Sequence, residues 1–270
     1  MFRLALGQIL VVPGAKAANL ARMDETVRAA ADEGADCIVL PEAMSVGWTD
    51  ASSSQLADEI PAGETAAALR RAAAKYRMYV CSGLVERADG SVFNSALLVS
   101  PDGEILLQHR KIWELEIGQR CYSLGRKLSV VQTPIGAVGL LICADASAPD
   151  RTLLQALALM GADIILSPCA WAVPPEYDNE KEPYGQMWLD AYQAVARQYR
   201  IWIAGVSNVG PIASGAWAGY SCIGSSMLIS ANGSVVARGP YGSSAEALLV
   251  ADVSLEPRPA WGTAWEAVWR

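Results

Sequence analysis

Short apolar runs alternate with longer amphipathic segments along the chain, and this alternation occurs twice. Each half begins with a segment rich in Ala, Leu and charged residues, continues with a short β-branched run, and then enters a second amphipathic segment. Apolar positions at helical spacing predict helices, whereas short apolar runs between them predict buried strands. The expected helix, strand and helix are residues 17–32, 37–40 and 65–76 in the first half, and 151–160, 164–166 and 184–199 in the second.

The two halves also repeat one another in sequence, in the same order. Asp-Gly at 102–103 and Asn-Gly at 232–233 follow apolar runs at equivalent places, where they predict hairpin turns. Such self-similarity usually indicates two copies of one supersecondary unit. The repeated segments are GADCIVLPE (34–42) and GADIILSPC (161–169), KYRMYVCSG (75–83) and QYRIWIAGV (198–206), and NSALLVSPDGEI (94–105) and GSSMLISANGSV (224–235).

This pattern predicts an α/β protein in which two sheets pack face to face and the helices lie outside. We therefore expect a four-layer αββα sandwich with an internal pseudo-two-fold duplication. No Pro-, Gly- or Ser-rich linker separates the halves, so residues 1–270 are expected to form a single domain.

Composition narrows the class of protein further. Hydrophobic residues make up 52% of the chain and charged residues 18%, which excludes a disordered protein. The net charge is −7 and no basic run occurs, so we expect neither nucleic acid nor a membrane surface as partner. The apolar N-terminal run is interrupted by Gly7, Gln8 and Pro13, and we interpret it as a first strand of a cytoplasmic protein rather than a signal peptide.

Six cysteines and a single histidine limit the metal chemistry. The cysteines form no CxxC pair, and most lie inside apolar runs, which is typical of reduced, buried thiols. A structural zinc site needs clustered thiolate and imidazole ligands, but His109 is the only histidine. We expect no metal and no cofactor.

Three reactive or charged residues each follow a strand-like run. Glu42, Lys111 and Cys143 are expected to meet beyond the carboxyl ends of strands, where functional side chains of α/β sheets gather. A carboxylate can take the proton of an attacking thiol, and a fixed ammonium group can stabilise the resulting oxyanion. From the residues alone, a structural role for each remains an open alternative.

The segments around these residues carry a more specific signal. LPEAMSVGW (40–48), FNSALLVSPDGEILLQHRK (93–111) and GLLICADASAPD (139–150) resemble the three catalytic motifs of the nitrilase superfamily, the carbon–nitrogen hydrolases. The resemblance extends from the first expected strand to about residue 255. It implies an αββα sandwich, in agreement with the duplication described above.

The resemblance also implies roles for individual residues. Glu42 is expected as the general base, Lys111 as the oxyanion-stabilising lysine and Cys143 as the nucleophile, with the backbone N–H of Ala144 as a second oxyanion donor. The family often carries a second glutamate that contacts the lysine. Glu114 and Glu116 are both candidates, and we expect Glu116.

The implied enzyme is a thiol-dependent hydrolase that cleaves a non-peptide C–N bond and releases ammonia or an amine. Strict nitrilases usually carry Cys-Trp-Glu, whereas this chain has Cys-Ala-Asp at 143–145, as is typical of the amidase and carbamoylase branch. Many amidase relatives have an arginine four residues after the cysteine, where this chain has Ser147. Because arginine is the natural partner of a carboxylate, we expect a small neutral amide as substrate.

Several alternatives accompany this interpretation. Trp48, Trp113 and Trp171 are expected to line the substrate pocket, although ordinary core packing would explain Trp171 equally well. His109 is expected to be structural rather than the partner of Cys143 in a papain-like dyad. Cys169 is expected to be a buried structural thiol.

Other functions also remain open at this stage. The same triad could act on a carbamoyl compound or a small nitrile, and a catalytically silent binding or scaffold protein could retain the fold. Relatives commonly pair, so a homodimer or higher homo-oligomer is expected, with residues 260–270 suited to a swapped contact.

Overall fold

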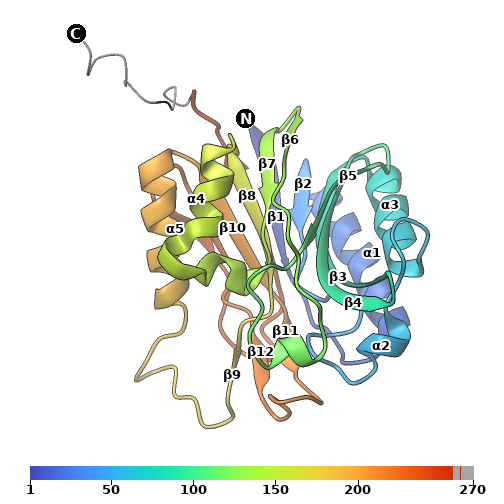
Figure 1. The fold of residues 1–270 in the computed structure, drawn as a ribbon. Helices are drawn as coiled ribbons and strands as arrows, with labels where there is room; N and C mark the ends of the chain where they lie inside the picture. Colours follow the sequence, from blue (N-terminus) through green and yellow to red (C-terminus); the bar gives the residue numbers. More distant parts are fainter. Residues whose placement is uncertain (258–261, 263–270) are drawn as a thin grey trace, which may run out of the picture.

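Two six-stranded sheets form the centre of the molecule, and helices cover both of their outer faces (Figure 1). The computed structural model describes residues 1–257 and residue 262. The first sheet has the order β15-β1-β2-β3-β4-β5, and the second has the order β14-β13-β10-β8-β7-β6. The αββα sandwich predicted from the sequence is therefore confirmed.

The elements have the following bounds. The first sheet consists of β1 (Phe2–Gln8), β2 (Cys37–Val39), β3 (Tyr79–Ala88), β4 (Ser91–Val99), β5 (Ile105–Arg110) and β15 (Ala247–Val253). The second consists of β6 (Val130–Thr133), β7 (Gly136–Leu140), β8 (Ile164–Cys169), β10 (Trp202–Ser207), β13 (Met227–Ile229) and β14 (Val235–Arg238). A small third sheet contains β9 (Ala172–Val173), β11 (Val209–Pro211) and β12 (Ser221–Ile223). The α-helices are α1 (Lys16–Asp32), α2 (Ser53–Leu56), α3 (Glu64–Tyr76), α4 (Thr152–Leu159) and α5 (Gln186–Tyr199).

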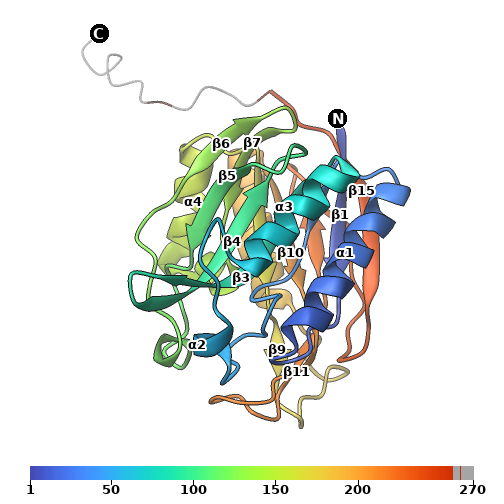
Figure 2. The same ribbon diagram turned by 90° about the vertical axis from the view of Figure 1, so that its right-hand side faces the viewer.

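The internal duplication appears directly in the strand order. Strands β1-β2-β3-β4-β5 of the first sheet correspond to strands β7-β8-β10-β13-β14 of the second. In each run of adjacent strands, two parallel pairings are followed by two antiparallel ones. Helices α1 and α3 cover the first sheet (Figure 2), and α4 and α5 occupy the equivalent places on the second. Both α3 and α5 end at an arginine of the repeated Tyr-Arg pair, Arg77 and Arg200, each in the left-handed conformation.

Strand β2 explains why its sequence is an unbroken apolar run. Cys37 and Val39 face the core between the two sheets, whereas Ile38 faces the core between the first sheet and helices α1 and α3. A strand that is buried on both faces needs apolar residues at every position. The short run therefore places the residue that follows it, Glu42, deep inside the molecule, where it is 1% exposed.

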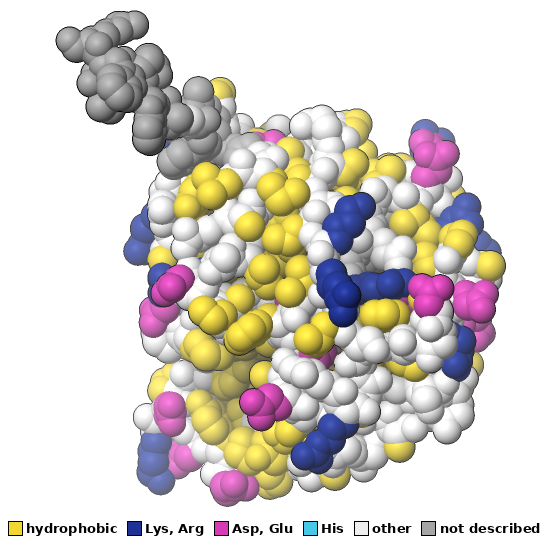
Figure 3. Space-filling view, viewed as in Figure 1, with side chains coloured by type: hydrophobic (Ala, Val, Ile, Leu, Met, Phe, Trp, Pro, Cys, Tyr) yellow, Lys and Arg dark blue, Asp and Glu magenta, His cyan; other side chains and the backbone are white. Residues whose placement is uncertain are grey.

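The surface carries some large apolar side chains. Leu159, Met160 and Met187 are among those exposed, and hydrophobic side chains gather along the middle of the face shown in Figure 3. Within the described residues, no helix is both long and apolar enough to cross a membrane. The swapped contact expected for residues 260–270 falls almost entirely outside the described part of the chain.

Candidate active site

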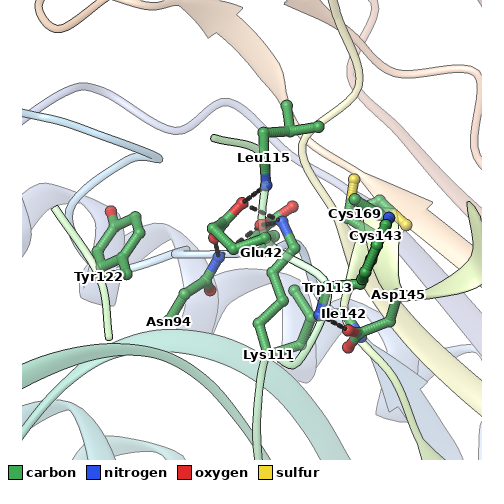
Figure 4. A network of polar contacts seen from close by, with 12 residues as sticks. Glu42, Asn94, Lys111, Trp113, Leu115, Tyr122, Ile142, Cys143, Asp145 and Cys169 are labelled. Carbon is green, nitrogen blue, oxygen red and sulfur yellow. Dashed lines mark hydrogen bonds and ion pairs between the residues drawn. The ribbon is translucent and has the colours of Figure 1, made fainter. Parts of the chain in front are cut away.

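The three predicted catalytic residues come together in one place. Glu42 follows β2, Lys111 follows β5 and Cys143 follows β7, and all three side chains line one cavity of about 160 Å³. The two sheets meet here, because the N–H of Glu42 donates to the carbonyl of Cys169 at 3.1 Å. Figure 4 shows Glu42 and Lys111 pointing toward one another, with Asn94 beside them.

Lys111 is held by two carboxylates. Its Nζ lies 2.7 Å from Oε1 of Glu42 and 2.8 Å from Oε1 of Glu114. The amide of Asn94 donates to both carboxylates, at 2.6 Å to Glu42 and 2.9 Å to Glu114. All four side chains are buried, so one ammonium group and one amide satisfy two carboxylates that are almost entirely shielded from bulk solvent.

This arrangement sets the charge states of the base and the cation. Burial and the neighbouring Glu114 raise the pKa of Glu42, although Lys111 and Asn94 partly offset this. Burial alone would lower the pKa of Lys111, but Glu42 and Glu114 outweigh it and raise that pKa well above its ordinary value. Lys111 is therefore a permanent cation, and Glu42 is a stronger base than an exposed glutamate.

Cys143 occupies a strained turn directly after the core strand β7. Its φ angle is +45°, in the left-handed region that non-glycine residues seldom adopt, and its N–H donates to Oγ of Ser167 at 3.2 Å. Contact with the Cys169 thiol and burial raise the pKa of Cys143 well above its ordinary value. The resting group is therefore a thiol, and its attack on a substrate requires a base.

Asp145 connects the cysteine turn to the lysine segment. Its Oδ1 accepts the N–H groups of Ile112 and Trp113 at 3.0 and 2.7 Å, and its Oδ2 accepts from Ile142 N–H at 3.0 Å. His109 Nε2 lies 2.8 Å from the same Oδ2. Burial opposes ionisation, yet these hydrogen bonds hold the pKa of Asp145 below its usual value. His109 is therefore bonded to Asp145, whereas a papain-like dyad would require it to reach Cys143.

The expectation that Glu116 contacts the lysine is wrong. Glu114 makes that contact. The chain turns immediately after Lys111, so the side chain three positions later points back to the lysine Nζ. Oε1 of Glu114 also accepts the N–H of Leu115 at 2.9 Å, and Gly118 leaves the space that the carboxylate fills. Glu116 is exposed.

The tryptophans divide into two groups. Trp48 and Trp171 line the cavity, but Trp113 is 47% exposed and does not, so its assignment to the pocket is wrong. Trp113 contributes only its backbone N–H, which Asp145 holds. Three further aromatic residues of the cavity wall lie in segments far along the chain and were not expected from any motif: Tyr184, Trp188 and Trp217.

Ala144, the expected second oxyanion donor, and Ser147 also line the cavity. No group of three or more residues with metal-ligating side chains occurs in the described part of the chain.

Comparison with known proteins agrees with this geometry. A family model described as carbon-nitrogen hydrolase matches residues 3–262. The omega-amidases NIT2 of Danio rerio and Xenopus tropicalis are 30% and 29% identical to this chain, over 94% of it and 89% of each relative.

Solved structures show the same fold. The carbon-nitrogen hydrolase of Helicobacter pylori G27 superposes with a TM-score of 0.82 at 21% identity, covering 94% of this chain and 89% of that one. The NitN amidase of Nesterenkonia sp. AN1 has a TM-score of 0.78 at 22% identity, covering 94% and 93%.

Proposed function

The chain belongs to the carbon-nitrogen hydrolase family, and we propose that it hydrolyses small neutral amides through a thioester on Cys143. Its match to the omega-amidases covers 94% of this chain and 89% of each relative, and it supports a hydrolase of the amidase type that depends on a cysteine. The observation that carries the proposed site is the meeting of Glu42, Lys111 and Cys143 around one cavity.

In the first stage, the sulfur of Cys143 attacks the amide carbon while Glu42 takes the thiol proton. The negative charge that develops on the substrate oxygen is stabilised by the ammonium group of Lys111 and the backbone N–H of Ala144. Glu42 then returns its proton to the leaving nitrogen, and ammonia or an amine departs.

In the second stage, water attacks the thioester carbon and Glu42 removes its proton. Collapse of the second tetrahedral intermediate releases the carboxylic acid and regenerates the thiol. Glu114 has a defined part in this cycle, because it still balances the charge of Lys111 when Glu42 is protonated.

The charges in the cavity favour a neutral substrate. Among the described residues that line it, Lys111 is the only cation, and two carboxylates already hold it. Ser147 stands on the wall where an arginine would bind a substrate carboxylate. We therefore propose that an ω-amide of a dicarboxylic acid is a poor substrate, in contrast to what the name of the omega-amidase relatives suggests for those proteins.

The cavity also limits the acyl group. Its volume of about 160 Å³ is close to the roughly 150 Å³ of an apolar cavity known to hold benzene. Trp171 and Trp188 stack on this wall with ring centroids 5.2 Å apart, and Trp48 and Trp217 contribute further apolar surface. These walls suit a compact aliphatic or single-ring acyl group.

Ammonia release from a substrate panel tests the proposal. The panel contains neutral aliphatic and aromatic amides, ω-amides of dicarboxylic acids, carbamoyl compounds and nitriles, with the wild type and Cys143→Ala assayed side by side. We expect the neutral amides to be hydrolysed fastest and Cys143→Ala to release nothing. Efficient turnover of an acidic amide with poor turnover of neutral ones would overturn the substrate class, and preference for a nitrile would favour nitrile hydrolysis instead.

We also propose that the protein acts in the cytoplasm as a homodimer or higher homo-oligomer. The six cysteines are all free, which suits a reducing compartment. The exposed side chains of Leu159, Met160 and Met187 supply apolar surface for association. Light scattering at micromolar concentration tests the assembly, and a monomer would refute it.

A further inference from the structure

Cys169 is a second thiol at the active site that the proposed mechanism does not use. In the parallel pairing of β7 with β8, Leu140 lies opposite Leu166. Cys143 lies three residues beyond that pair, in the turn after β7, and Cys169 is the last residue of β8. Beyond the paired residues the segments stay together, since the N–H of Cys143 donates to Oγ of Ser167.

The turn that carries Cys143 lies over the face of β8 that carries Cys169. Ser167 and Cys169 are two residues apart on this strand, so their side chains share a face, and the hydrogen bond from the N–H of Cys143 to Oγ of Ser167 holds the turn against that face. The two thiols are within hydrogen-bonding reach of one another, and Figure 4 shows both cysteine side chains in the same part of the site. Oγ of Ser167 lies 3.6 Å from Sγ of Cys169, so this hydroxyl links the backbone of one cysteine to the side chain of the other.

The two thiols differ in how accessible they are from the cavity. Cys143 lines the cavity, whereas Cys169 is fully buried behind it. A small oxidant that enters the cavity therefore meets Cys143 first and finds Cys169 next to it. Cys37, Cys81 and Cys222 are buried and do not line this cavity, so they are not placed to respond in the same way.

We propose that Cys143 and Cys169 form a reversible disulfide when the protein meets hydrogen peroxide. Glu42 takes the thiol proton of Cys143, the sulfur attacks one peroxide oxygen and the O–O bond breaks. This gives a sulfenic acid, and the other oxygen leaves as water with the proton that Glu42 returns. The thiol of Cys169 then attacks that sulfur, the S–S bond forms, the S–O bond breaks, and the hydroxyl group leaves as a second water with the thiol proton. Two thiols thus supply the two electrons that reduce the peroxide.

The disulfide has a consequence for activity that rests on the proposed function of Cys143. A sulfur bonded to Cys169 cannot attack a substrate, so hydrolysis stops. The same bond prevents oxidation of Cys143 to the irreversible sulfinic and sulfonic acids. A dithiol reductant restores both thiols by exchange and returns the enzyme to activity. Cys169 therefore acts as the resolving cysteine for the nucleophile.

Mass spectrometry tests the disulfide without any substrate. The wild-type protein is treated with hydrogen peroxide, alkylated and digested without reduction. We expect a cross-linked peptide joining Cys143 to Cys169, with the loss of two hydrogen atoms. If Cys143 carries two or three added oxygen atoms and no cross-linked peptide forms, the proposal is wrong, whatever the enzyme hydrolyses.

Two variants extend the test to activity, each normalised to its own untreated rate. With Cys222→Ser as the matched control, we expect dithiothreitol to restore most of the activity after peroxide, as in the wild type. With Cys169→Ser we expect permanent inactivation and oxygen addition at Cys143. Recovery of Cys169→Ser to the same extent as the control would refute the resolving role, and Cys169→Ala provides the same comparison if the serine variant does not fold.

Discussion

Substitution of Asp145 by Asn should weaken both the fold and the catalytic turn, by an amount that follows from its hydrogen bonds. Asparagine keeps one acceptor oxygen, which can still serve Ile112 and Trp113. Its NH₂ group then faces His109 and the N–H of Ile142. His109 can accept by changing its tautomer, but the N–H of Ile142 loses its acceptor.

One buried donor without a partner costs about 1–3 kcal/mol. For a chain of this size, the melting temperature should fall by roughly 2–10 °C. Because Ile142 immediately precedes Cys143, kcat should fall further than the stability loss alone explains. Asp58→Asn is the matched control, since Asp58 also accepts backbone N–H groups, but these belong to the first turn of α3 rather than to the segments of Lys111 and Cys143.

Calorimetry and steady-state kinetics on both variants measure these effects. Because folding lowers the pKa of Asp145, its stabilisation is present above the ordinary aspartate pKa and is lost as pH falls through the lowered value. The stability difference between the wild type and Asp145→Asn should therefore shrink in strong acid. A variant with the melting temperature and kcat of the wild type would refute the reasoning.

Three further predictions test the site. Asn94→Asp removes a hydrogen-bond donor to Glu42 and adds a negative charge beside it, so it should raise the pKa of Glu42. The acid limb of the pH profile of kcat/KM should then move to higher pH by about one unit. An acid limb that does not move would contradict the role of Glu42 as the base. Glu114→Gln should lower kcat/KM by about tenfold or more, whereas the control Glu116→Gln should leave kcat/KM within about twofold of the wild type. Equal effects of the two substitutions would contradict the assignment of Glu114 as the second glutamate. Ser147→Arg should raise the turnover of ω-amides relative to neutral amides, and an unchanged ratio in the ammonia assay would show that this position does not select the substrate.

The fold and the catalytic triad could be predicted because both depend on local patterns. Each catalytic residue follows a short buried run. A strand that is buried on both faces can be recognised in the sequence as an unbroken apolar segment. The repeated GAD segments likewise reveal the duplication, since equivalent strands need the same apolar residues and the same turns. The strand-end positions, together with the resemblance of the surrounding segments to the nitrilase superfamily motifs, therefore singled out Glu42, Lys111 and Cys143.

The residues around the triad could not be predicted in the same way. The choice between Glu114 and Glu116 depends on how tightly the chain turns after Lys111, and both residues are compatible with the motif. Trp188 and Trp217 reach the cavity from segments that only the folded chain brings together. Asp145 was visible in the Cys-Ala-Asp motif, but three of its four hydrogen bonds reach residues more than 30 positions away in sequence.

The thioester on Cys143 is the central claim, and rapid acid quenching during turnover tests it most directly. The quenched protein is analysed by intact mass and then by peptide mapping, with a neutral amide as substrate. The account predicts a mass increase equal to the acyl group, located on the peptide that contains Cys143 and absent from Cys143→Ala. Steady turnover by Cys143→Ala, or an acyl group found on another residue, would contradict it.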